Sequence, residues 1–357
     1  MTSSTPVPVF DGHNDVLLRL MRRSGKAPER AFLEGESVGH LDWPRMRAGG
    51  FAGGFFAVFA PSPEEPGLDV DAMMAHPQYD VPLPAEVSLA EAQRATLHMA
   101  ALLLRIERKS KGQVEVCRSA AQIRRCIDAG VLASVLHIEG AEAIDPDFHM
   151  LDVLHGAGLR SLGPVWSRAN IFGHGVPFRY PSKPDTGPGL TDHGRALVKA
   201  CNRLKIMIDL SHLNERGFWD VAKLSDAPLV ATHSNAHAIC PHSRNLTDRQ
   251  LAAIRDSGGM VGVNFATAFI RQDGRREANT TLDEVIRHVD HLIEHVGVDG
   301  VGLGSDFDGA TIPVAIGDVR GLPRLVQAMR QHGYDDATLR RICFENWIGV
   351  LGRTWGG

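Results

Sequence analysis

The sequence has little cysteine, no long apolar run and no strong excess of one charge. Its 357 residues include five cysteines, an odd number, and these are scattered along the chain. Such usage argues against a disulfide framework or a zinc ribbon and favours buried thiols in a reducing cytoplasm. No segment approaches the roughly 20 apolar residues of a membrane span. The N-terminus also lacks the charged start and apolar stretch of a signal peptide.

The charged residues nearly balance, with 38 Lys and Arg against 42 Asp and Glu, and both signs are interspersed. Because there is no basic stripe or polybasic helix, neither nucleic acid nor a membrane surface is an expected partner. The hydrophobic content of 43% is typical of a globular protein with a substantial core. A chain of this length suggests about two domains, but an α/β barrel with insertions reaches it as one.

Eight apolar runs recur along the chain, and we interpret them as strands. Several are hydrophobic at nearly every position, which is typical of parallel strands covered on both faces. The runs are Val7–Asp15, Gly53–Ala60, Ala133–Gly140, Leu159–Trp166, Lys205–His212, Pro228–Ser234, Gly259–Phe265 and Gly300–Asp308.

Segments with helical spacing fall between these runs. Three examples are Ala85–Lys109, Leu190–Leu204 with Thr191 as its cap, and Thr281–Val296. Capping boxes are expected where Thr247 precedes Gln250 and where Thr281 precedes Glu284. Strand–helix alternation repeated eight times predicts an α/β fold, namely a (β/α)8 TIM barrel with residues 1–357 as one domain.

Three further segments complete this prediction. The stretches Pro61–Pro84 and Ala169–Gly189 are rich in Pro or Gly and follow strands. They are therefore expected as insertions over the C-terminal face of the barrel, where substrates bind. Residues 317–357 are interpreted as closing helices. Within them, the apolar tail 346–351 favours core packing or a homodimer contact over chemistry.

Polar residues mark the ends of the predicted strands. His13 and Asp15 end the first strand, Glu139 the third, His212 the fifth and His233 the sixth. In a barrel these ends meet at one mouth, where clustered imidazoles and carboxylates need a cation to offset their burial. One zinc ion takes about three protein ligands, so five candidates suggest two ions with Glu139 bridging them.

A hydroxide between two such metals would be a nucleophile at neutral pH, with a carboxylate of the last strand as proton shuttle. Spacing alone does not choose between Asp306 and Asp308. We expect Asp209 and His137 to point away from the cluster. Arg244, after the sixth strand, has two interpretations: a clamp for a substrate carboxylate or a surface ion pair.

Taken in order, these motifs resemble the membrane (renal) dipeptidase family of zinc metallopeptidases, within the amidohydrolase-like barrels. The resemblance implies a binuclear zinc site with the ligands given above. It also implies Asp306 as the acid/base residue and Arg244 as the residue that binds the C-terminal carboxylate of a dipeptide. The family cleaves free dipeptides, accepts a D-residue at the C-terminal position and in some members opens β-lactams. The similar segments, spread over nearly the whole chain, are 11–15, 138–140, 208–212, 233–234, 243–245 and 304–309.

One position departs from the family pattern. Trp166 stands where well-known members have a histidine near the scissile carbonyl, and an indole N–H donates one hydrogen bond but cannot become cationic. His174, in the insertion just beyond, is a candidate for the missing imidazole, with a solvated loop histidine as the alternative. The departure keeps open an amidohydrolase acting on an N-acyl amino acid, a lactone or another amide. A catalytically inactive binding barrel would lack a ligand, and none is missing.

Overall fold

The computed structural model describes residues 6–23, 27–63 and 65–356. Residues 1–5 lie outside the described residues. They are part of the N-terminal segment in which no signal peptide is expected. Within the described ranges, no helix combines the length and the apolar character needed to cross a bilayer.

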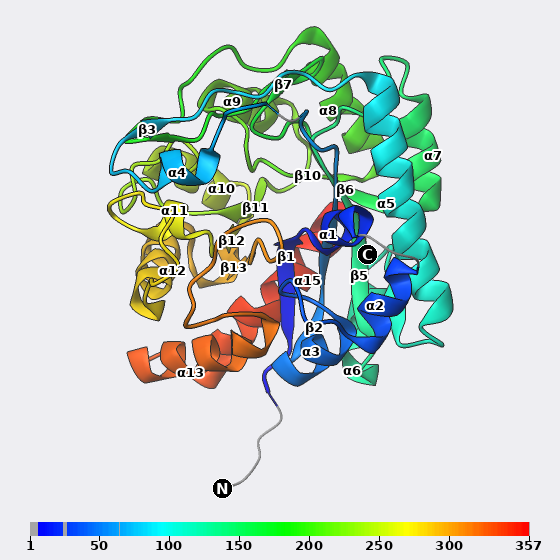
Figure 1. Cartoon of the computed structure of the whole chain (residues 1–357), viewed down its shortest axis with the longest axis vertical. Coiled ribbons are helices and arrows are strands. Elements are labelled where there is room, and N and C mark those ends of the chain that lie inside the picture. The colour runs from blue at the N-terminus through cyan, green and yellow to red at the C-terminus, as the bar shows by residue number, and fades with distance from the viewer. Residues whose placement is uncertain (1–5, 24–26, 64, 357) are drawn as a thin grey trace, which may run out of the picture.

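A parallel sheet forms the centre of the molecule (Figure 1), with its main strands in the order β10-β6-β5-β2-β1-β13-β12-β11. Each of the eight predicted runs overlaps one of these strands, although β2 and β5 begin two residues and one residue before their runs. Strand β4 (Val114–Val116) pairs with β5 as an addition. An isolated parallel bridge joins Asp209, just after β10, to Val230 at the start of β11, the other end of the order. The strands are β1 Val9–Asn14, β2 Phe51–Phe59, β5 Leu132–Glu139, β6 Leu159–Gly163, β10 Met207–Ile208, β11 Val230–Ser234, β12 Met260–Val263 and β13 Val301–Leu303.

Helices surround this sheet and alternate with its strands along the chain (Figure 1), which confirms the predicted α/β class. After a loop that follows β13, the chain is mainly helical from Val319 to Trp355, as expected for the closing segment 317–357. The helices are α1 Val16–Arg22, α2 Pro28–Glu34, α3 Trp43–Gly49, α5 Leu89–Lys109, α6 Ala120–Ala129, α7 His149–Ala157, α8 Asp192–Leu204, α9 Glu215–Leu224, α10 Asp248–Asp256, α11 Thr267–Ile270, α12 Leu282–Val296, α13 Leu322–His332, α14 Asp336–Arg340 and α15 Asn346–Trp355, with short helical turns at 298–300, 319–321 and 341–345.

The predicted caps are confirmed at two helices and wrong at a third. Thr191 accepts a hydrogen bond from the Gly194 backbone N–H, and Thr247 forms a capping box. At α12, however, Thr281 makes no side-chain cap. Glu284 pairs instead with Arg287, three residues further along the same helix, because the guanidinium offers its carboxylate a cationic partner.

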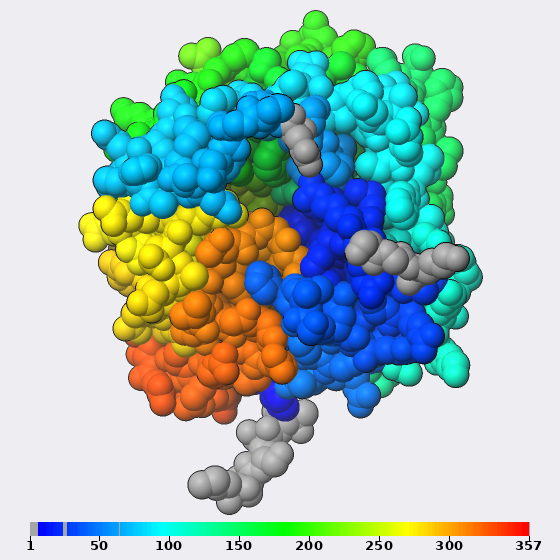
Figure 2. Space-filling view, viewed as in Figure 1, coloured from blue at the N-terminus to red at the C-terminus, as the bar shows by residue number. Residues whose placement is uncertain are grey.

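The two insertions lie together over the carboxyl ends of the strands. The first contains α4 (Val70–Met74) and β3 (Tyr79–Asp80), and the second contains β9 (Arg179–Tyr180) and a small hairpin of β7 (169–170) and β8 (173–174). Strands β3 and β9 pair antiparallel, so the insertions support each other. Figure 2 shows a hollow in this face beside the α4 segment.

Trp347, from α15, fills the space enclosed by strands β1, β2 and β13. Its ring lies 5.3 Å from that of Phe55, and its Nε1 donates to the Leu303 carbonyl oxygen at 3.0 Å. A Cβ atom added at Gly12 or Gly302 would come within 2.6 Å of the indole. These glycines therefore leave the room that Trp347 occupies. The apolar tail 346–351 therefore packs in the core, which was one of the two interpretations of its sequence. The other, a homodimer contact, stays a prediction.

Replacement of Trp347 by Ala should lower the free energy of unfolding by about 3–5 kcal/mol, because the cavity left among the glycines cannot refill. Urea unfolding of the metal-free protein measures this loss. Trp355→Ala is the matched control, because Trp355 is half-buried on the same helix. Equal losses in the two variants would contradict the assignment of Trp347 to the core.

Candidate active site

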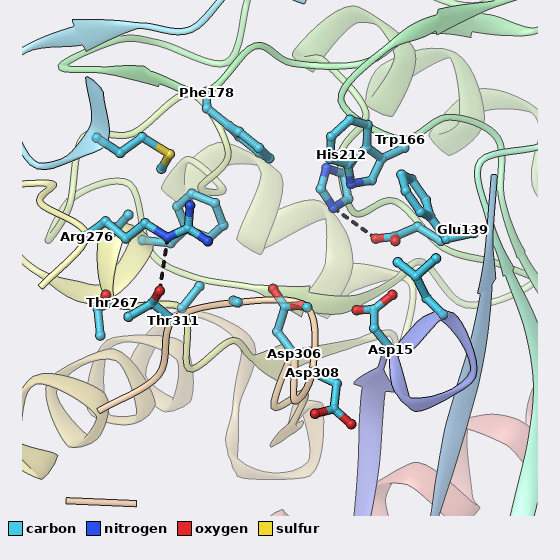
Figure 3. A pocket seen from close by; sticks show the side chains of 18 of the residues that line it. Asp15, Glu139, Trp166, Phe178, His212, Thr267, Arg276, Asp306, Asp308 and Thr311 are labelled. Carbon is cyan, nitrogen blue, oxygen red and sulfur yellow. Dashed lines mark hydrogen bonds and ion pairs between the residues drawn. The ribbon is translucent and has the colours of Figure 1, made fainter. Parts of the chain in front are cut away.

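The five predicted metal ligands meet at the carboxyl ends of the strands, and Figure 3 shows three of them, Asp15, Glu139 and His212. Glu139 Oε1 lies 3.6 Å from His13 Nε2, 3.0 Å from His212 Nε2 and 3.2 Å from His233 Nε2. Asp15 Oδ2 lies 3.2 Å from His13 Nε2. All five side chains are buried. Residues that are far apart in the sequence therefore present their polar atoms to one small volume.

The spacing of two histidines fits a metal ion. His212 Nε2 and His233 Nε2 lie 3.1 Å apart, while each Nδ1 contacts a hydroxyl at 2.8 Å, from Ser167 and Thr232 respectively. Burial, with neighbouring positive charge, lowers the pKa of both imidazoles well below the usual value, so both are neutral. Two nitrogens about 2.0–2.1 Å from one tetrahedral zinc ion would lie roughly 3.3 Å apart.

The carboxylates of the cluster repel one another. Burial raises the pKa of Glu139 well above its usual value, and Asp15 adds to this shift. Burial also raises the pKa of Asp306. Although burial disfavours its charged form, His13 has its pKa raised to about 10 by Glu139 and Asp15. A divalent cation would relieve this repulsion in place of protons.

Asp306 and Asp308, between which sequence spacing could not choose, lie in different surroundings in the structure. Asp306 lies at the ligand cluster, where its Oδ2 accepts from Asn264 Nδ2 at 3.0 Å. Asp308 turns away and accepts from Arg19 Nε at 2.9 Å and from the His40 backbone N–H. Both have positive φ angles, 59° and 66°, so the chain leaves strand geometry here and the two side chains diverge.

The predictions for Asp209 and His137 were wrong, because both face the interior. His137 and Glu139 are two residues apart on β5 and so share a face. Strand β10 ends at Ile208, and His212 has a φ of 67°, so strand alternation does not extend from Asp209 to His212. Asp209 Oδ2 instead accepts from the Thr232 hydroxyl at 2.6 Å, behind His233.

A cavity of about 190 Å³ opens above the ligands (Figures 2 and 3). Trp166 forms part of its wall, with its ring 5.8 Å from that of His212. Phe178, Phe269 and Arg276 also line the cavity, although they are not among the residues predicted from the sequence. They lie on segments that follow strands, but no motif distinguishes them from other loop residues.

Two predicted substrate residues are absent from the cavity lining. Arg244 is buried behind the wall, where Nη1 donates to Ser234 Oγ and Nη2 to the His233 carbonyl oxygen, both at 2.8 Å. Its Nε has no hydrogen-bond partner among the described residues. His174 lies on the hairpin of β7 and β8, which holds it outside the lining.

Comparison with known proteins connects this geometry to a family. A family model described as membrane dipeptidase, peptidase family M19, matches residues 4–354. The chain belongs to this family. The resemblance drawn from the motifs is thereby confirmed, and the M19 assignment makes the chain a metallo-dipeptidase by family.

Relatives of this M19 chain include two solved structures. A metallo peptidase from Rhodobacter sphaeroides, liganded with a phosphinate mimic of the dipeptide L-Ala-D-Ala, is 59% identical with a TM-score of 0.96, covering 98% of this chain and 100% of that one. The dipeptidase AC of family M19 is also 59% identical with a TM-score of 0.96, covering 99% and 100%. An uncharacterized protein in the pqqA 5' region of Klebsiella pneumoniae is 53% identical over 255 residues, 71% of this chain and 94% of that protein.

Proposed function

We propose that this protein is a zinc-dependent dipeptidase that hydrolyses free dipeptides and tolerates a D-residue at the C-terminal position. The observation that carries the proposal is the convergence of three imidazoles on Glu139 Oε1 at the floor of a small cavity. The L-Ala-D-Ala mimic bound to the Rhodobacter sphaeroides relative supports both the substrate class and the D-residue. A cytoplasmic location is part of the proposal, supported by five free cysteines.

We infer that the sheet closes into a complete (β/α)8 barrel that forms one domain over residues 1–357. The bridge between Asp209 and Val230, at the two ends of the strand order, supports closure. The rings of His13 on β1 and His233 on β11 stack at 3.8 Å although two strands separate β1 from β11 in that order. Strong curvature of the sheet is needed for this contact.

Two zinc ions fit the ligand set, with Glu139 bridging them. His13 and Asp15 would hold one ion, and His212 and His233 the other. Close grouping of the ligand atoms of His13 with Asp15, and of His13 with Glu139 and His233, supports adjacent ions. Bound divalent ions at such a site polarise a scissile carbonyl and make water nucleophilic at neutral pH.

Asp306 is proposed as the acid/base residue. It lies beside the ligands, lines the cavity and is oriented by Asn264 Nδ2. Because burial raises its pKa, the Asp306 carboxylate is a better proton acceptor than an exposed aspartate. It would take a proton from the attacking water and give it to the leaving amine.

Arg244 is proposed to bind the C-terminal carboxylate of the dipeptide. Burial lowers the pKa of its guanidinium to about 10, but Asp209 and Asp306 favour the charged form. The unpartnered Nε leaves a buried donor that a substrate carboxylate would satisfy. Trp166 would narrow the cavity beside His212, whereas His174 has no comparable support.

An amidohydrolase of another amide or lactone is the second candidate function. Trp166 favours it, because the indole in the cavity wall cannot act as the cationic imidazole that well-known family members carry. A hydrolysis screen of L-Xaa-L-Xaa and L-Xaa-D-Xaa dipeptides with added zinc, beside N-acyl amino acids and lactones, decides between the two. Hydrolysis of N-acyl amino acids or lactones, but of no dipeptide, would contradict the dipeptidase proposal and favour this second function.

Metal analysis of the purified protein should find close to two zinc ions per chain. Glu139→Gln should lose at least one of them together with activity, because a bridging carboxylate contributes to both positions. Full activity of the wild type with a single tightly bound ion would contradict the binuclear site.

Asp306→Asn should lower kcat by about 10²–10⁴-fold, because the amide keeps the shape but cannot accept the proton. Its zinc content should stay close to that of the wild type. Asp308→Asn is the control, because Asp308 is occupied by Arg19 and His40. An active Asp306→Asn variant beside an inactive Asp308→Asn variant would reverse the assignment.

Free dipeptides should be hydrolysed far better than their C-terminal amides, because amidation removes the ionic partner of Arg244 and leaves a buried donor poorly paired. Arg244→Met should abolish this preference. The measurement is kcat/KM for matched free and amidated dipeptides. Equal turnover of free and amidated dipeptides by the wild type would contradict the dipeptidase proposal.

A further inference from the structure

His233 is backed by a short chain of hydrogen bonds that ends at Asp209. The Thr232 hydroxyl oxygen lies 2.8 Å from His233 Nδ1 and 2.6 Å from Asp209 Oδ2. All three residues are buried. Neither Asp209 nor Thr232 has been given a role at the metal site above.

The direction of these hydrogen bonds follows from the available protons. Asp209 Oδ1 already accepts from the backbone N–H groups of Ser211 and Thr232, at 3.0 and 2.8 Å. The carboxylate is thus an acceptor, and the Thr232 contact at 2.6 Å has the length of an O–H···O⁻ bond. Because a hydroxyl has only one hydrogen, the Thr232 oxygen must accept from His233.

The proton of neutral His233 is therefore on Nδ1. Its Nε2 keeps a free lone pair, and this atom lies 3.2 Å from Glu139 Oε1 and 3.1 Å from His212 Nε2. A metal ion binds an imidazole through such an unprotonated nitrogen, and a partner of the other nitrogen sets which tautomer is present.

We propose that Asp209 and Thr232 are positioning residues that hold His233 in the Nδ1–H tautomer and so prepare its Nε2 as a zinc ligand. The inference rests on the zinc site of the proposed function, but it is independent of the substrate. Asp209 would then have two roles, because its backbone also forms the bridge to Val230.

His212 is held differently. Its Nδ1 contacts the Ser167 hydroxyl, and no carboxylate accepts from Ser167 in the part of the chain that the structure describes. This hydroxyl is free to donate or to accept, so it does not select one tautomer. The two histidines that face each other therefore differ in how firmly the protein sets their protonation.

Asp209→Asn tests the proposal with almost no change in shape. The amide oxygen would keep the backbone N–H donors, and the amide nitrogen would donate to Thr232 Oγ1. The hydroxyl must then donate to His233 Nδ1, which moves the imidazole proton to Nε2, where it competes with zinc. We expect about a 10–100-fold weaker affinity for one zinc equivalent, measured by competition with a chromophoric chelator.

The metal-free protein, labelled with ¹⁵N-histidine, supplies a second readout. The His233 proton should be on Nδ1 in the wild type and on Nε2 in Asp209→Asn, which a merely structural role of Asp209 would not require. Thr232→Val should also weaken zinc binding, and Thr232→Ser should restore it. Ser161→Ala is the control, because Ser161 has a buried hydroxyl 2.8 Å from Nδ1 of His137, which is not a proposed ligand.

Wild-type zinc affinity in Asp209→Asn, or equal affinities in Thr232→Val and Thr232→Ser, would overturn the proposal. If Asp209→Asn does not fold, the two Thr232 variants decide the question. Failure of the proposed function looks different: the wild type would bind zinc tightly, with the tautomer effects intact, and would not cleave dipeptides.

Discussion

The approach of three histidine Nε2 atoms to a single oxygen of Glu139 is the constraint on which the rest of the structure depends. The contacts span 3.0 to 3.6 Å, and the side chains come from three separate strands and one strand end. Buried polar groups at this density are unfavourable unless each has a partner. The sheet must therefore curve strongly, and a cation is needed where the ligands meet.

Residues packed behind the proposed ligands provide hydrogen-bond partners for the histidines. Hydroxyls of Ser167 and Thr232 contact the Nδ1 atoms of His212 and His233, and Asp209 supports Thr232. Trp347 fills the adjacent interior, where glycines leave space for its ring. The ligands thus stand on strand ends whose own environment is close-packed, which keeps their spacing fixed.

The cavity above the ligands is built differently. Its walls include Met74 and Phe178 from the two insertions and Phe269 from α11. Pairing of β3 with β9 holds the insertions against each other. Strands and strand ends hold the proposed metal ligands, while segments outside the sheet form much of the cavity wall.

The α/β class, the eight strands and the meeting of the five proposed ligands could be predicted from the sequence, because strand hydrophobicity and strand-end polarity are local patterns. The order of the strands was also implied by the predicted barrel, since each main strand except β10 lies beside the next one in the chain, and the first, β1, pairs with the last, β13. Tertiary structure decided the rest. Backbone turns with positive φ at His212, Asp306 and Asp308 set where those side chains point, and no alternation rule applies there. Asp209 became an interior partner of Thr232, Arg244 lay behind the cavity wall, and Phe178 and Arg276 joined the lining. Those placements depend on contacts between segments distant in sequence, which local patterns do not encode.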